Sequence, residues 1–280
     1  MELNNIYLGD CYKLIKDIPD KSIDLVYTDI PYDFAQGGGG GSFGANEKPY
    51  NKEIKVDRES TYKRKAEREY QLWKSTIDEK ESRKHELEYW RYLEKASTSQ
   101  FDTGIDYSIY DEFCRVLKDI YIYIWLSKNQ IPYTIDYFVN QKKCNFEILT
   151  WHKTNPIPKT NNNWLPDTEY CLFFRAQGAH RLNDGFELKH KFYVSGINQA
   201  DKKKYHHPTI KPIELVKKHI LHATKENDIV LDPFSGSGTT LKACQETNRR
   251  YIGFELNEEY YKIAKNRLDH IDANGNIELF

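Results

Sequence analysis

The chain has 280 residues and is almost neutral, with 41 Lys and Arg against 42 Asp and Glu. This length fits one large domain or two of ordinary size, and an aromatic content of 14% is too high for a disordered chain. The longest apolar stretch, Ile120 to Leu126, is far too short to span a bilayer. The first residues lack the basic and apolar parts of a signal peptide, so we expect a folded, cytoplasmic protein.

The cysteines contain no C-x-x-C pair, which argues against both a zinc site and a disulfide framework. They are Cys11, Cys114, Cys144, Cys171 and Cys244. His206 and His207 are followed by a proline and lack nearby Cys or acidic ligands, so we expect no metal site. The near-neutral charge leaves a DNA partner open, because phosphate contacts require only a local basic face.

The first clear element is a short apolar run, Ile23 to Tyr27, rich in the residues of a buried parallel strand. It leads into Asp29-Ile30-Pro31-Tyr32, which puts an acid and an aromatic residue at the carboxyl end of the strand. In open α/β sheets this is the edge where ligands bind. We therefore expect a functional site there.

Residues 36–100 have the composition of an insertion. Gly37 to Gly41 predict a flexible loop, which could be a plain linker or a mobile lid. Lys63 to Lys95 carry apolar residues at helical spacing among charges of both signs, a pattern of a solvated helix or of a DNA-reading surface. We expect this insertion to belong to a single domain of residues 1–280.

The middle of the chain alternates helical and strand patterns, as in an α/β fold. The predicted helices are 110–117, 131–141 and 212–223, and the predicted strands are 121–126, 146–151 and 170–174. Gln177 to Tyr205 is polar and moderately basic, and we expect it to be irregular.

A strand from Asp228 to Asp232 is followed by a Gly-rich turn and a helix start, where backbone N–H groups favour a carboxylate or phosphate. Thr239 stands where a P-loop requires Lys, and Leu241 where a dinucleotide fingerprint requires its third Gly. The next strand, Tyr251 to Glu255, ends in an acid of the kind that binds ribose hydroxyls. We therefore expect a nucleoside ligand without a pyrophosphate.

These segments resemble the motifs of the amino-group DNA methyltransferases in the motif order of the β group. Asp232 to Thr240 resembles motif I, which binds S-adenosylmethionine, and Asp29 to Tyr32 resembles the catalytic D-P-P-Y. The remaining similar segments are Gly9-Asp10, Trp151 to Pro156 and His207 to Pro212. The likeness covers nearly all of the chain except 36–100 and 177–205, and it implies a doubly wound, mostly parallel α/β sheet.

The resemblance implies a role for each residue of the catalytic motif. Asp29 would accept a hydrogen bond from the target amino group, the carbonyl of Ile30 would accept a second, and Tyr32 would stack on the flipped base. Ile30 departs from the usual Pro of the family, although Pro31 still favours an extended conformation at position 30. This departure leaves a catalytically silent, cofactor-binding DNA protein as an alternative.

The resemblance also implies a set of residues that bind S-adenosylmethionine. Glu255 would bind the ribose, Asp10 the adenine amino group, and Lys211 would close the far side. The rest belong to motif I, near the methionine moiety: Asp232, Phe234, Gly236, Gly238, Thr239 and Thr240.

Methylation of adenine N6 in double-stranded DNA is the function we predict, because Asp at the first catalytic position is commoner in adenine enzymes of this family. Cytosine N4 is the alternative target, whereas the absence of any Pro-Cys dipeptide excludes the cytosine-C5 class. An RNA or small-molecule target fits the combined motifs less well. We expect 177–205 to be a short target-recognition segment that the 36–100 insertion supplements. A homodimer and a cognate restriction enzyme remain open as partners.

Overall fold

The chain divides into two compact units, Met1–Ile30 with Ile105–Phe280, and Pro31–Gly104. The computed structural model describes residues 1–32, 105–156, 164–179, 183, 185–197, 204–205 and 210–270. The predicted insertion 36–100 lies outside the described residues, as do His206 to Thr209 and parts of 177–205. Nearly all of the described residues belong to the first unit.

The first unit is built on an eight-stranded sheet with the strand order β1-β8-β7-β2-β3-β5-β4-β6. The strands are β1 (Asn5–Leu8), β2 (Leu25–Asp29), β3 (Tyr121–Leu126), β4 (Asn145–Lys153), β5 (Thr168–Arg175), β6 (Phe192–Ser195), β7 (Ile229–Asp232) and β8 (Arg250–Glu255). Only β5 runs antiparallel to its neighbours, β3 and β4. The mostly parallel sheet of the prediction is confirmed.

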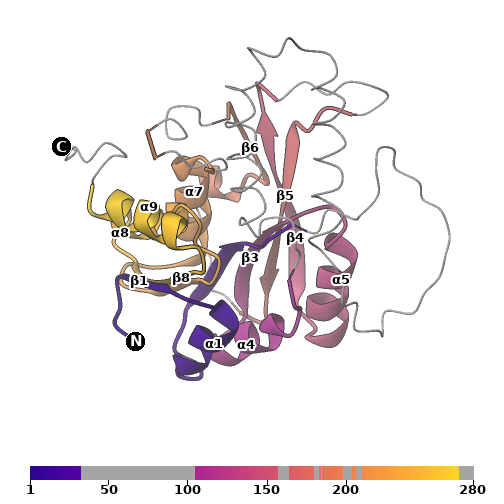
Figure 1. Ribbon diagram of the computed structural model, residues 1–280. Coiled ribbons are helices and arrows are strands. Elements are labelled where there is room, and N and C mark those ends of the chain that lie inside the picture. Colours follow the sequence, from indigo (N-terminus) through magenta and orange to yellow (C-terminus); the bar gives the residue numbers. More distant parts are fainter. Residues whose placement is uncertain are drawn as a thin grey trace, which may run out of the picture. The chain divides into compact units, whose positions relative to one another are not determined.

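Helices cover both faces of this sheet. They are α1 (Cys11–Leu14), α4 (Ile109–Val116), α5 (Ile131–Ile135), α7 (Ile213–Ala223), α8 (Thr239–Glu246) and α9 (Glu258–Leu268), with short helices η1 (Ile15–Asp17), η3 (Asp136–Gln141) and η4 (Phe186–Lys189). In Figure 1, α8 and α9 lie above strands β1 and β8, and α1 and α4 lie below them. This two-faced cover is the doubly wound arrangement.

The central strands are buried on both faces because their side chains alternate between two cores. On β2, Val26 packs into the core formed with α1 and α4, whereas Leu25 and Tyr27 pack into the core formed with α7, α8 and α9. On β3, all of Tyr121–Leu126 is buried. These continuous apolar runs are the signal from which both strands were predicted.

Two predicted elements differ in the structure. The helix predicted over 131–141 is α5 followed by the π-helix η3, Asp136–Gln141. The prediction that 177–205 is irregular is wrong for two of its described segments, η4 and β6. Strand β6 pairs in parallel with β4 and alternates exposed and half-buried residues. A four-residue edge strand of this kind depends on pairing rather than on its own apolar pattern.

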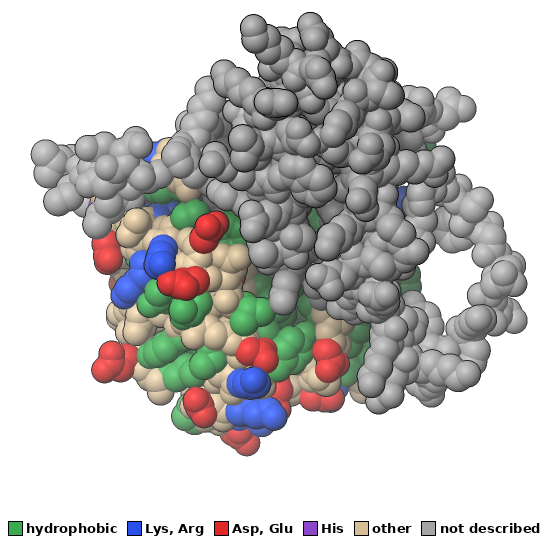
Figure 2. Space-filling view, viewed as in Figure 1, with side chains coloured by type: hydrophobic (Ala, Val, Ile, Leu, Met, Phe, Trp, Pro, Cys, Tyr) green, Lys and Arg blue, Asp and Glu red, His purple; other side chains and the backbone are tan. Residues whose placement is uncertain are grey.

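On the face seen in Figure 2, the described surface has no large patch of a single charge sign. Figure 2 shows Lys and Arg side chains interspersed with Asp and Glu over the described residues of that face. Among the described residues, no helix is long and apolar enough to cross a membrane.

Gly253 of β8 lies where the Gly-rich turn and α8 approach the sheet. A Cβ at this position would lie 2.5 Å from Leu241 Cδ1 and 2.6 Å from Ser235 Oγ. Both contacts are far inside van der Waals distance, so the close packing of α8 on β8 requires a residue without a side chain.

We expect Gly253→Ala to lower the free energy of unfolding by about 1–3 kcal/mol, because the added methyl overpacks this contact. Gly185→Ala is the matched control, since its Cβ would meet Leu188 Cδ1 at an ordinary 3.4 Å. Urea unfolding followed by circular dichroism measures both. Equal stability of the two variants would contradict the assigned packing.

Candidate active site

Four acidic residues from distant parts of the sequence gather at one edge of the sheet. Glu255, Asp232 and Asp29 end the adjacent strands β8, β7 and β2, and Asp10 follows β1 by two residues. The edge is common because all four strands run parallel. Leu8 pairs with Glu255, and the Gly9 N–H donates to the Glu255 carbonyl at 2.8 Å. The structure thus brings the predicted cofactor and catalytic acids to neighbouring strand ends.

The Glu255 carboxylate holds the Gly-rich turn against the end of β8. Its two oxygens accept hydrogen bonds from the backbone N–H of Gly236 at 2.8 Å and of Asn257 at 2.7 Å. Burial raises the pKa of Glu255, and the two N–H donors oppose that shift. The carboxylate is therefore fixed in place by the main chain.

The turn between β7 and α8 requires glycine at two positions. Gly236 and Gly238 have φ of 50° and 74°, in the left-handed region. A Cβ on Gly238 would also lie 2.9 Å from the Ala264 Cβ of α9. These residues give the backbone a tight path that ends at the first turn of α8, as the sequence predicted.

The two threonines that begin α8 are buried, and their hydroxyls have partners inside the protein. Thr239 Oγ1 accepts a hydrogen bond from Arg267 Nη1 at 2.7 Å, and Thr240 donates to the Asp232 carboxylate. Arg267 also contacts the carbonyl of Ser237 at 3.3 Å. A buried guanidinium is therefore placed beside the N-terminus of α8.

Asp232 is a buried acid whose ionisation changes near neutral pH. Burial raises its pKa to about 7, although the Thr240 hydroxyl and the Phe234 N–H favour the charged form. Phe234 N donates to Asp232 Oδ1 at 3.2 Å. The acid thus ties the turn to the end of β7 in either protonation state.

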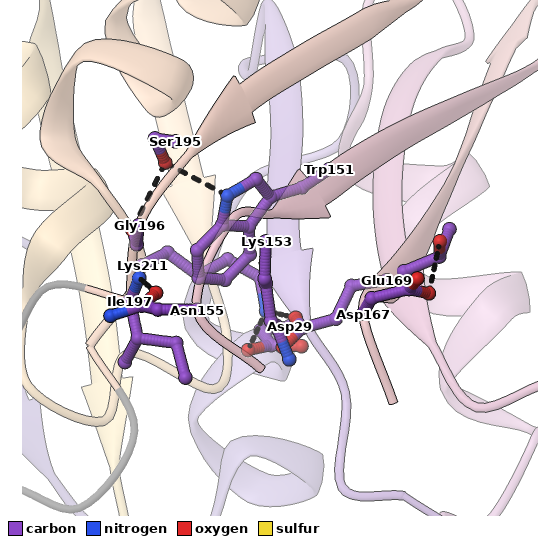
Figure 3. A network of polar contacts seen from close by, with 11 residues as sticks. Asp29, Trp151, Lys153, Asn155, Asp167, Glu169, Ser195, Gly196, Ile197 and Lys211 are labelled. Atoms are coloured by element: carbon purple, nitrogen blue, oxygen red, sulfur yellow. Dashed lines mark hydrogen bonds and ion pairs between the residues drawn. The ribbon is translucent and has the colours of Figure 1, made fainter. Parts of the chain in front are cut away.

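Asp29, at the end of β2, belongs to a network of charged side chains that also come from β4, β5 and the segment before α7 (Figure 3). Lys211, just before α7, places its Nζ 2.6 Å from Asp29 Oδ2 and 3.0 Å from Glu169 Oε2 of β5. Lys153 of β4 pairs with the other Glu169 oxygen at 2.6 Å. Lys211, predicted from the sequence to close the cofactor site, thus contacts the predicted catalytic acid.

Glu169 carries no family motif, and the sequence analysis missed it. Burial raises the pKa of Glu169, but the Lys211 and Lys153 ammonium groups outweigh burial and hold it at about 2. Glu169 is therefore ionised throughout the neutral range. Its signal in the sequence is weak: an acid one residue inside the start of a strand that is otherwise aromatic and apolar.

The segment Trp151 to Pro156, one of those that resemble the family's motifs, joins β4 to the chain at and after β6. Trp151 Nε1 donates to Ser195 Oγ at 2.9 Å, and Asn155 Oδ1 accepts from Ile197 N at 2.6 Å (Figure 3). The segment thus positions Lys153 and the short strand β6.

Ile30 occupies a position that suits its side chain and its N–H. Its side chain is 1% exposed and belongs to the core beneath α1 and α4. Its N–H donates to the Trp125 carbonyl at 3.1 Å, which extends the pairing of β2 with β3. A proline could not donate this hydrogen bond, and its smaller ring would fill less of the core. Pro31 and Tyr32 are half-buried and begin the second unit, and their predicted roles stay predictions.

Within the described ranges, no three His, Cys, Asp or Glu side chains gather as metal ligands. The polar groups at the strand ends are instead carboxylates, backbone N–H groups and lysines. Such groups recognise hydroxyl, amino and carboxylate groups of an organic ligand.

The raised pKa of Asp232 gives stability a specific pH dependence. Its contribution is fully present below its ordinary pKa of 3.8 and is lost as the pH rises through about 7. Relative to Asp232→Asn, the wild type should lose on the order of 3 kcal/mol of unfolding free energy between pH 4 and pH 8. Chemical denaturation across this range measures the difference. A constant difference between the two proteins would show that Asp232 is ionised throughout.

Replacing Ile30 with the family's usual proline should destabilise this chain. Ile30→Pro loses the hydrogen bond to Trp125 and part of a buried side chain, with an expected cost of about 2–4 kcal/mol. Ile30→Val keeps the N–H and should cost only about 1 kcal/mol. Thermal and urea unfolding compare the two. If Ile30→Pro were as stable as Ile30→Val, the sheet hydrogen bond would be unimportant here.

Two relatives are similar to this chain over most of its length. The chain is 29% identical over 277 residues to the Type II methyltransferase M2.LlaDCHI of Lactococcus lactis subsp. cremoris, covering 93% of this chain and 87% of that protein. It is also 29% identical to the Type II methyltransferase M.HinfI of Haemophilus influenzae, covering 99% and 72%.

Solved structures support the fold. The M1.HpyAVI–SAM complex matches with a TM-score of 0.56 at 22% identity, over 94% of this chain and 98% of that one. PvuII DNA methyltransferase (cytosine-N4-specific) matches with a TM-score of 0.61 at 16% identity, over 94% and 85%. The model of the DNA methylase family N6_N4_Mtase matches residues 23–266. The chain therefore belongs to the N6/N4 DNA methylase family.

Proposed function

We propose that this protein transfers a methyl group from S-adenosylmethionine to the N6 amino group of adenine in double-stranded DNA. The observation that carries the proposal is the adjacency of β7 and β2. One strand leads into the Gly-rich turn expected to hold the cofactor, and the other ends in Asp29. A methyl donor and an acceptor base at neighbouring strand ends would lie within reach of each other.

The residues at the ends of β1, β8 and β7 fit S-adenosylmethionine chemically. The Glu255 carboxylate offers acceptors for ribose hydroxyls, and Asp10 offers one for the adenine amino group while capping α1 through Tyr12 N at 3.0 Å. The turn through Phe234, Gly236 and Gly238 would lie beside the methionine moiety. When bound, the cofactor supplies an electrophilic methyl group on a sulfonium.

The start of α8 suits the carboxylate of the same ligand. Thr239 and Thr240 place their backbone at the positive end of the helix dipole, and buried Arg267 adds a full positive charge beside it. Asp232 supports the turn from below through Phe234 N. These groups would bind and orient the cofactor.

Asp29 and its neighbours would act on the base. Asp29 accepts a hydrogen bond from the target amino group, and the carbonyl of Ile30 accepts a second, so that the nitrogen lone pair is directed toward the methyl group. Tyr32 stacks on the base after it leaves the duplex. As the N–C bond formed, the bond between the methyl group and the sulfonium sulfur would break and leave a neutral thioether, and the amino nitrogen would lose one proton to water.

The choice of adenine follows from Asp at the first catalytic position, and cytosine N4 is the second candidate. The names of the two sequence relatives also support a role in a restriction–modification system. A target-recognition role for the described part of 177–205 fits its position beside β4, because β6 pairs with the strand that carries Trp151 and Lys153.

Asp29→Asn tests the activity and the role of the carboxylate together. It keeps the size of the side chain but removes the charged acceptor, so methylation should fall about 10²–10³-fold. Nucleoside mass spectrometry of unmethylated DNA incubated with protein and S-adenosylmethionine measures the product. Cofactor affinity, measured by calorimetry, should stay within about twofold because Asp29 lies outside the proposed cofactor contacts.

Asp136→Asn is the control, since Asp136 is a carboxylate of η3 hydrogen-bonded to Asn140 and Gln141 on the surface. N6-methyladenine that depends on Asp29 is the expected result. Detection of N4-methylcytosine instead would support the same mechanism with cytosine as the target base. A wild-type protein that binds the cofactor but methylates neither base would overturn the proposal in favour of a silent DNA-binding protein.

A further inference from the structure

We propose that Lys211, anchored by Glu169, is a positioning residue that keeps the Asp29 carboxylate ionised and fixed in one orientation. The inference rests on the proposed function, because it assumes that Asp29 is the acceptor for the target amino group. It adds two side chains to the catalytic end of β2, one of them, Glu169, outside every motif of the sequence.

Three contacts from three strands fix the Lys211 ammonium. It lies 2.6 Å from Asp29 Oδ2 on β2 and 3.0 Å from Glu169 Oε2 on β5. It also lies 4.7 Å from the centre of the Trp125 ring on β3. The Lys211 side chain is only 12% exposed, whereas the Asp29 side chain is 39% exposed, so the ammonium is largely withdrawn from solvent while the carboxylate it contacts stays accessible. An ammonium held on three sides fixes the carboxylate that it touches.

The platform under Lys211 is rigid and uncharged. Trp125 is fully buried, and its Nε1 donates to the Tyr27 hydroxyl at 2.8 Å. That hydroxyl lies 3.3 Å from His219 Nδ1. Burial lowers the pKa of His219 to about 3, so the imidazole is neutral at physiological pH. The His219 imidazole therefore places no positive charge beneath the Trp125 ring, where it would oppose the cation–π contact of Lys211.

Glu169 completes the charge balance of the cluster. Two ammonium groups, Lys211 and Lys153, face two carboxylates, Asp29 and Glu169. Without Glu169, the two ammonium groups would face each other across one carboxylate. Without Lys211, Asp29 would face the Glu169 carboxylate, and the like charge would favour the protonated form of Asp29.

Among the described residues, three further titratable groups interact electrostatically with Asp29: Tyr27, Cys171 and Asp232. Burial raises the pKa of the Tyr27 hydroxyl and of the Cys171 thiol well above their ordinary values, so both are uncharged. Asp232, on the neighbouring strand β7, has a pKa of about 7 because of burial. It adds some negative charge above that pH, which further increases the need for a cation at Asp29.

The first test is Lys211→Met, which keeps the length of the side chain and removes its charge. We expect kcat for DNA methylation to fall about 10–100-fold at pH 7, with KM for DNA and Kd for S-adenosylmethionine within about twofold. The acidic limb of the pH–rate profile should shift upward by about one unit or more. Lys211→Arg should recover most of the rate because a guanidinium can bind both carboxylates.

The effect of Glu169→Gln on kcat should have opposite signs in the wild type and in Lys211→Met, and this distinguishes a positioning role of Lys211 from a general loss of structure. In the wild type, Glu169→Gln should lower kcat about 3–10-fold, because Lys211 loses its anchor. In the Lys211→Met background, the same Glu169→Gln change should raise kcat, because it removes the carboxylate beside Asp29 and releases the Lys153 ammonium from its partner. Misfolding cannot produce opposite effects in the two backgrounds.

Glu147→Gln is the matched control. Glu147 is on β4 and forms an exposed ion pair with Lys191 at 2.5 Å. Its removal should leave both kcat and the pH–rate profile unchanged, since exposed ion pairs contribute little.

The inference is overturned if Lys211→Met retains the wild-type kcat, or if the double variant is no faster than Lys211→Met. It is also overturned if the loss is confined to Kd for S-adenosylmethionine, since Lys211 would then serve the cofactor. An inactive wild-type protein, or activity indifferent to Asp29→Asn, would instead refute the proposed function.

Discussion

The parallel alignment of β1, β8, β7 and β2 is the constraint on which the site depends. Parallel strands end at the same edge, so residues from position 10 to position 255 meet there although the chain separates them widely. In this protein each of the four strands delivers an acid to that edge. Gathering four carboxylates is unfavourable unless each is compensated.

The four acids are compensated in three ways, which separate the acids proposed to bind the cofactor from the acid proposed to act on the base. Asp10 accepts from the first turn of α1, and Glu255 accepts from two backbone N–H groups. Asp232 is buried deeply enough for its pKa to reach about 7. Of the four, Asp29 is the one paired with an ammonium, that of the half-buried Lys211. The acids assigned to the cofactor are thus held by dipoles or by burial, whereas the acid assigned to the base has a full counter-charge.

The elements that sequence patterns predicted well are those whose signal is local. Ile23 to Tyr27 and Tyr121 to Leu126 are continuous apolar runs because both faces of their strands are buried. The turn around Gly236 and Gly238 was found from glycines that the backbone conformation requires. By contrast, β6 is stabilised by pairing with β4, and Glu169 derives its importance from Lys153 and Lys211. Both depend on contacts that no local pattern records.

Ile30 shows how a departure from a family pattern can be consistent with the same chemistry. The proposed mechanism asks only for the carbonyl of this residue, which any amino acid supplies. The proposed chemistry does not use its side chain or its N–H. In this chain the side chain packs into the core, and the N–H donates to the Trp125 carbonyl. Trp125 is also the platform under Lys211. Ile30 therefore ties the strand end that carries Asp29 to the strand whose Trp125 supports Lys211, an arrangement consistent with the proposed chemistry.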